Sequence, residues 1–128
     1  MSYYRSICAI WAIGFIAYGL YCALQPAAVM TLIGYEALGA DAHTEFLAMY
    51  GGVQIALGAF GLAALRNQQL LPAYMLLLSI VFLLLALGRA IGYATLEGLG
   101  GYSLIAIIFE TVSFVIFLFA YLRVEANA

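Results

Sequence analysis

Two side chains of opposite charge stand inside long apolar runs, and they are the groups most able to do chemistry there. Arg89 lies near the C-terminal end of residues 71–93, and Glu110 is the ninth residue of residues 102–122. An arginine at the middle of a membrane helix costs roughly 2.5–3.5 kcal/mol on insertion scales, so it needs a partner, an interface or a task. Its planar guanidinium can satisfy two acceptors at once. We therefore predict a central ion pair between Arg89 and Glu110.

Three polar residues of the preceding apolar run, residues 44–65, are candidate neighbours of this pair. Glu45 stands at the outer rim of that run as a second acceptor for Arg89, and Tyr50 and Gln54 are candidate hydrogen-bond partners. Lipid does not solvate such groups, so we expect the polar helix faces to turn toward one another. The candidate polar core or ligand-binding site is therefore Arg89, Glu110, Glu45, Tyr50 and Gln54.

This constellation has three interpretations that stay open. The ion pair can simply fix the register of two helices. It can belong to a functional site for a ligand, an ion or a proton. Alternatively, Arg89 snorkels to the outer interface.

Other chemistries find little support in the sequence. His43, with Asp41 and Glu45 nearby, is the only histidine and gives weak ground for a metal or haem site. The sequence has no Ser-His-Asp or Cys-His arrangement and no CxxC motif, so we assign no catalytic residue, metal or cofactor. A net charge of −2 and the absence of lysine exclude the basic surface that nucleic-acid binding requires.

Four apolar runs must position these residues. The 128-residue chain is 68% hydrophobic and 8% charged, with a mean hydropathy of +1.13, whereas a soluble domain is about 25% charged. About 20 apolar residues cross a bilayer. We predict an all-α membrane protein: a single transmembrane domain over residues 1–128, forming an up-down bundle of four transmembrane helices. The predicted spans are residues 7–24, 44–65, 71–93 and 102–122, with a short interfacial segment between the first two.

Local signals refine this arrangement. Pro26 ends the first helix, Thr44 is the candidate N-cap of the second, and Pro72 lies in the first turn of the third. Cys8 and Cys22 lie about 21 Å apart on one helix, so we expect two buried thiols that do not bridge to each other. Small residues let helices approach closely in lipid. We expect this role for Gly51, Gly52, Gly58, Gly61, Gly88 and Gly92.

The charges that flank the spans predict the orientation. With an even number of spans, one side receives the cations Arg5, Arg66 and Arg123. The opposite connections hold no cation and carry Glu36, Asp41 and Glu97. Positive residues concentrate on the cytoplasmic side of membrane proteins. We therefore predict a multi-pass protein with both termini in the cytoplasm.

Short motifs resemble a known family. The stretch Thr44-Glu45-Phe46, with Met49-Tyr50-Gly51-Gly52-Val53-Gln54 and Leu57-Gly58, resembles the second-helix signature of a bacterial family of small four-helix membrane proteins of unknown function. Gly88-Arg89-Ala90-Ile91-Gly92 and the Glu110 helix resemble that family's later motifs. The family is grouped with the DoxX-like proteins. The likeness covers Pro26 to about Leu122 and implies a four-helix fold in a bacterial inner (plasma) membrane.

The chain departs from that family at one point. An arginine often follows the Glu-Phe pair, whereas Leu47 and Ala48 follow it here, so a site that includes this arginine is altered. The family carries no established activity. DoxX-like proteins include a membrane subunit linked to thiosulfate:quinone oxidoreduction, which implies a redox accessory role by analogy alone.

Three functions follow as hypotheses, and we favour a non-catalytic one. In the first, the bundle binds a small amphiphilic or lipid-like molecule, or serves as an accessory subunit of a larger membrane complex or homo-oligomer. In the second, it is a small oligomeric transporter or proton-coupled carrier that uses Glu110. In the third, it is a membrane enzyme with Glu110 as acid or base. The last two need Glu110 to leave Arg89 in at least one state, so an intact pair favours the first.

Overall fold

The computed structural model describes residues 2–95 and 100–126, and within these ranges the chain is helical and contains no strand. Four helical stretches are long and apolar enough to cross a membrane, and they indicate a multi-pass membrane protein: Tyr3–Leu24, Ala40–Arg66, Gln68–Thr95 and Gly101–Glu125. The predicted helical fold with four spans is therefore confirmed. The elements are α1 (Ser2–Leu24), α2 (Pro26–Ile33), α3 (Ala40–Phe46), a π-helical segment (Leu47–Gly52), α4 (Val53–Arg66), a 3₁₀ turn (Gln68–Leu70), α5 (Leu71–Thr95) and α6 (Gly101–Glu125).

The helix boundaries follow the sequence signals in most places. α1 ends before Pro26, which is the first residue of α2, and Pro72 lies in the first turn of α5. The second span begins earlier than predicted, because α3 starts at Ala40 after Gly39, a glycine with φ of +106°. Thr44 is therefore not an N-cap; its hydroxyl donates to the carbonyl of Ala40 within the helix, at 2.9 Å. Glu97, on which the predicted orientation partly depends, lies outside the described residues.

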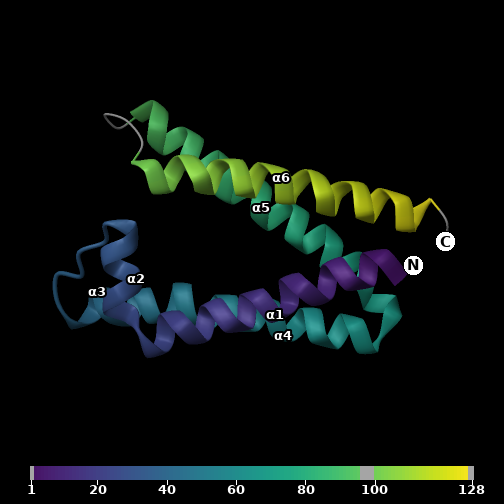
Figure 1. Cartoon of the computed structure of the whole chain (residues 1–128), viewed down its shortest axis with the longest axis horizontal. Helices are drawn as coiled ribbons and strands as arrows, with labels where there is room; N and C mark the ends of the chain where they lie inside the picture. The colour runs from purple at the N-terminus through teal and green to yellow at the C-terminus, as the bar shows by residue number, and fades with distance from the viewer. Residues whose placement is uncertain (1, 96–99, 127–128) are drawn as a thin grey trace. The chain divides into compact units, whose positions relative to one another are not determined.

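The chain divides into two compact units, residues 1–68 and 69–128. The first contains α1 to α4, and the second contains α5 and α6, as Figure 1 shows. Each unit is built on one antiparallel helix pair, although only α5 and α6 are joined by a short connection; the connection from α1 to α3 is long and contains α2. The single transmembrane domain over residues 1–128 stays a prediction.

In the first unit, α1 packs along the π segment and α4 through small residues. A Cβ atom at Gly58 would lie 2.5 Å from the carbonyl oxygen of Ala12, and one at Gly19 would lie 2.8 Å from the carbonyl oxygen of Gly51. Only glycine permits backbones this close, which is how helices associate where lipid supplies no hydrophobic driving force. Three contacts share one antiparallel register, each seven residues from the next along both helices: Arg5 with Leu65, Ala12 with Gly58, and Gly19 with Gly51.

The connection between α1 and α3 folds against the end of the first pair. α2 has only eight residues, about 12 Å, and is too short to span a membrane. It ends at Gly34, whose φ of +70° is a left-handed conformation that suits glycine. A small core of buried side chains holds this connection: Cys22, Val29, Met30 and Phe46. Cys8 and Cys22 are both buried, free thiols, as predicted.

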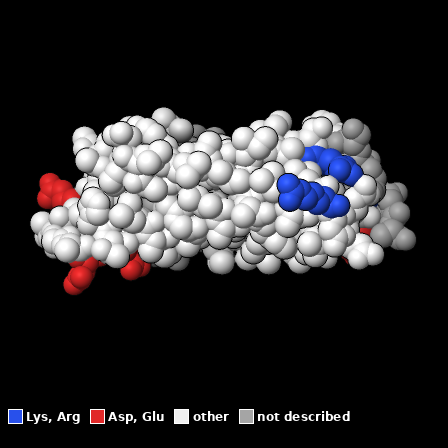
Figure 2. Space-filling model, turned by 90° about the horizontal axis from the view of Figure 1, so that it is seen from below, with Lys and Arg blue, Asp and Glu red and all other residues white. Residues whose placement is uncertain are grey.

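The antiparallel pair separates the charges of the first unit. Arg5 begins α1 and Arg66 ends α4, so the arginines share one end, whereas Glu36, Asp41 and Glu45 follow α2 or lie in α3 at the other end. Figure 2 shows this face with its basic side chains toward one end and most acidic side chains at the opposite end. This separation is the pattern that the positive-inside rule describes.

In the second unit, larger side chains fill the space between α5 and α6. The rings of Phe82 and Phe117 stack with centroids 6.0 Å apart and planes 11° apart, and Phe109 meets Phe82 edge to face at 5.9 Å. Arg89 and Glu110 stand seven residues further along their helices. This unit therefore uses the same two-turn spacing as the first.

Candidate functional site

The candidate site lies between α5 and α6, part-way along both helices. Glu110 comes nine residues after Gly101, about 13 Å along α6, against about 15 Å for half of the hydrocarbon core. Arg89 comes six residues before Thr95, about 9 Å from the same end of the unit. Because the helices are antiparallel, the two residues face each other across one interface, with Glu110 a few ångströms deeper.

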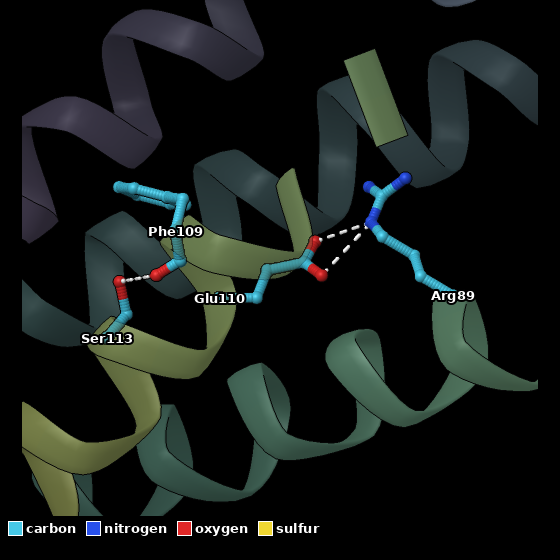
Figure 3. A network of polar contacts seen from close by, with 4 residues as sticks. All are labelled: Arg89, Phe109, Glu110 and Ser113. Carbon is cyan, nitrogen blue, oxygen red and sulfur yellow. Dashed lines mark hydrogen bonds and ion pairs between the residues drawn. The ribbon is translucent and has the colours of Figure 1, made fainter. Parts of the chain in front are cut away.

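Arg89 and Glu110 form an ion pair. The Nε–H of Arg89 donates to both carboxylate oxygens of Glu110, at 2.9 Å to Oε1 and 3.0 Å to Oε2. The structure thus brings together the two residues whose pairing was predicted from their depth. The donor is shared between two acceptors, so the pair is not a parallel, two-nitrogen fork. Figure 3 shows the consequence: the two terminal nitrogens of Arg89 point away from the carboxylate.

The two partners differ in exposure. The Glu110 side chain is 6% exposed, whereas the Arg89 side chain is 27% exposed. The guanidinium carbon also lies 5.5 Å from the ring centroid of Tyr102, a cation–π contact at the start of α6. Arg89 therefore has a carboxylate on its deeper side and an aromatic face toward the α6 N-terminus.

Ser113, the buried polar residue next to Glu110 on α6, forms its hydrogen bond within its own helix. One turn beyond Glu110, the Ser113 hydroxyl donates to the carbonyl oxygen of Phe109 at 2.7 Å (Figure 3). Serine commonly bonds the carbonyl four residues earlier when it lies inside a helix. Ser113 is thus occupied within its own helix and does not donate to Glu110 in this arrangement.

The other three predicted site residues belong to the first unit. Glu45 is exposed on α3, and Gln54 is half-buried on α4. Tyr50 lies in the π segment and stacks on Phe46, with ring centroids 4.7 Å apart and planes 14° apart. Their part in one site with Arg89 and Glu110 stays a prediction.

Residues 3–121, which include Arg89 and Glu110, match the family described as domain of unknown function DUF4345. The chain belongs to this family. Neither the curated proteins nor the solved structures include a match to the chain. Membership in the DUF4345 family supports the predicted resemblance to a family of unknown function, and it assigns no activity to the Arg89–Glu110 pair.

Sequence reasoning missed two features of this DUF4345 chain. Tyr102 is not among the predicted site residues, yet its ring contacts Arg89. Its spacing from Glu110, eight residues or slightly over two turns, places both on one face of α6 and could have revealed it. The π segment at residues 47–52 has no comparable signal, because its residues also suit an α-helix. Such segments occur often at functional sites.

No metal site is apparent in the described part of the chain. Among residues 2–95 and 100–126, no group of three or more His, Cys, Asp or Glu side chains is placed to hold an ion. His43 lies in α3, where its backbone N–H donates to the carbonyl oxygen of Gly39.

Proposed function

We propose that this DUF4345 protein binds a small amphiphilic or lipid-like molecule whose polar group sits at Arg89. One observation carries the proposal: Arg89 uses Nε for Glu110 and directs its two terminal nitrogens elsewhere (Figure 3). The terminal nitrogens of arginine are the ones that grip carboxylates and phosphates in a fork. An anion or a quinone-like oxygen is the chemistry that they suit.

The exposure of the pair supports the same function. Because 27% of the Arg89 side chain is exposed, a ligand can reach the guanidinium while the buried Glu110 carboxylate holds it in place. A polar head group would bind there, and the neighbouring Tyr102 ring would cover the adjoining apolar part. Glu110 then acts as the positioning partner that orients the guanidinium.

The ion pair weighs against the two alternatives. A proton carrier or an acid–base enzyme requires a carboxyl group that exchanges protons freely, whereas both Glu110 oxygens accept from a permanent cation. We further propose that the protein works as an accessory subunit of a membrane complex, in keeping with a DoxX-like relationship. Its proposed place is a bacterial inner membrane, with both termini in the cytoplasm.

Native mass spectrometry of the protein, extracted gently from its own membrane, tests this function. We expect a stoichiometric small molecule on the wild type and its loss from the double variant Arg89→Gln/Glu110→Gln. The double variant removes both charges together, so no lone charge is left to unfold the helix pair. Arg123→Gln is the matched control, because it removes one arginine from the same unit outside the pair.

Three outcomes would contradict the proposal. The first is a wild-type protein that carries no molecule. The second is a molecule that the double variant retains, and the third is a molecule that Arg123→Gln loses to the same degree. Circular dichroism of each variant shows whether the helices are intact.

A further inference from the structure

A second polar site lies in the first unit, at the end where α1 begins and α4 finishes. The Nη2 atom of Arg5 donates to the carbonyl oxygen of Leu65 at 3.0 Å, and Arg66 is the next residue along the chain. The bond lets Arg5 stabilise an unpaired carbonyl in the last turn of α4. It also fixes the Arg5 guanidinium at Leu65, the residue before Arg66.

The charges of these two arginines are not balanced by an ion pair in the described part of the chain. Among residues 2–95 and 100–126, neither Arg5 nor Arg66 forms an ion pair. The acidic residues of this unit follow α2 or lie in α3, at the opposite end of the helix pair (Figure 2). Two arginines at the same end of the helix pair, with the acidic residues at the other end, favour an anion from outside the chain.

The surface beside Arg5 has the shape and polarity for such an anion. A shallow depression is lined by Arg5, Ser6, Ala9 and Leu65, so it combines a cation and a hydroxyl with a small, apolar floor. Further along α1, the same side of the helix continues into Ile10 and Ile13, which are 63% and 60% exposed. A polar pocket is thus followed along α1 by an exposed apolar stripe.

We propose that the depression beside Arg5, with Arg66 as the next residue after its Leu65 wall, binds the phosphate of an anionic phospholipid. The two arginines hold the phosphodiester, Ser6 lines its pocket, and an acyl chain lies along Ile10 and Ile13. Arginine suits this role because its planar donors match phosphate geometry. Clusters of basic residues at a membrane surface attract anionic lipids by the same electrostatics. The site is separate from Arg89 and does not rest on the function proposed for it.

Lipid titration followed by native mass spectrometry tests this inference on the full chain in a non-ionic detergent. The probes are dioleoylphosphatidylglycerol, which is anionic, and dioleoylphosphatidylcholine, which has the same acyl chains and no net charge. We expect wild-type protein to bind the anionic lipid about tenfold more tightly, and Arg5→Gln/Arg66→Gln to abolish that preference. Inorganic phosphate at millimolar concentration should leave the lipid adduct in place.

One control separates this site from other cations. Arg123→Gln removes an arginine of the second unit that lies over the Phe119 ring, and it should keep the preference within twofold. If the double variant at Arg5 and Arg66 loses helicity, Arg66→Gln alone serves, because Arg66 makes no side-chain hydrogen bond among the described residues. It should reduce the preference about threefold.

Several results would overturn the inference. Equal binding of the two lipids would remove the role of the head-group charge. An equal loss with Arg123→Gln would show a general charge effect, and a loss confined to Arg89→Gln/Glu110→Gln would move the lipid to the other site. Displacement of the lipid by inorganic phosphate would identify a site for a soluble anion instead.

Discussion

The two helix pairs of this protein use the same spacing but different side chains. In the pair α1–α4, the helices touch at Ala12–Gly58 and Gly19–Gly51, where backbone atoms meet with no side chain between them. In the pair α5–α6, the corresponding contacts are the Phe82–Phe117 stack and the Arg89–Glu110 ion pair. Each pair repeats its contacts every seven residues, the period that keeps two helices in register.

The difference shows two ways to join helices where lipid competes for every apolar surface. Close backbone packing depends on shape alone, so it tolerates no added atom at the contact. Aromatic and ionic contacts depend on chemistry, so they tolerate a change of shape better than the loss of one partner. The first pair is therefore held by close backbone packing, whereas the second is held by aromatic rings and a pair of opposite charges.

The largest expected effect comes from breaking the ion pair on one side. Arg89→Ala leaves Glu110 charged and nearly enclosed, so we expect the free energy of unfolding to fall by about 3–5 kcal/mol. The double variant Arg89→Ala/Glu110→Ala should recover most of that loss, because no lone charge remains. Unfolding of Arg89→Ala, Glu110→Ala and the double variant in the same detergent, followed by circular dichroism, measures the difference. A double variant as weak as the sum of the two single variants would rule out the coupling.

Sequence reasoning located this pair because membrane physics leaves few options for a charge. Arg89 and Glu110 are the only charged residues within their predicted spans, and antiparallel helices place them at similar depth. The same logic found the four helices and the boundary at Pro26, where a missing N–H and a fixed φ act locally. These predictions succeeded because each depends on one residue type and on length.

Other features depend on which helix surfaces meet, and sequence spacing alone did not settle them. The glycines illustrate this: all six were expected at close contacts, yet a Cβ at Gly52, Gly88 or Gly92 would meet no described atom within 4 Å. The sequence predicts Thr44 as a helix N-cap, because it gives no clear signal that α3 starts one turn earlier, at Ala40. The π segment was missed because its residues also suit an α-helix.

A smaller effect is expected from filling the backbone contact of the first pair. In Gly58→Ala the new Cβ would lie 2.5 Å from the Ala12 carbonyl oxygen and equally close to Ile16, so the helices must separate. Overpacking of this kind costs about 1–3 kcal/mol. Gly14→Ala is the matched control, because no described atom lies within 4 Å of its Cβ. Thermal melts in which both variants unfold at one temperature would refute the close contact.

The smallest expected effect tests whether small residues matter where no backbone is near. Gly88 and Gly92 form a GxxxG pattern on α5, yet the described structure leaves open space beside both. Gly88→Ala and Gly92→Ala should therefore be neutral, or should raise the free energy of unfolding by up to about 1 kcal/mol through better helix propensity. The same melts used for Gly58→Ala measure this. A loss of stability at either position would mean that another helix packs against this face of α5. Both pairs would then use glycine for close helix contacts, and they would differ only in which helix the glycines contact.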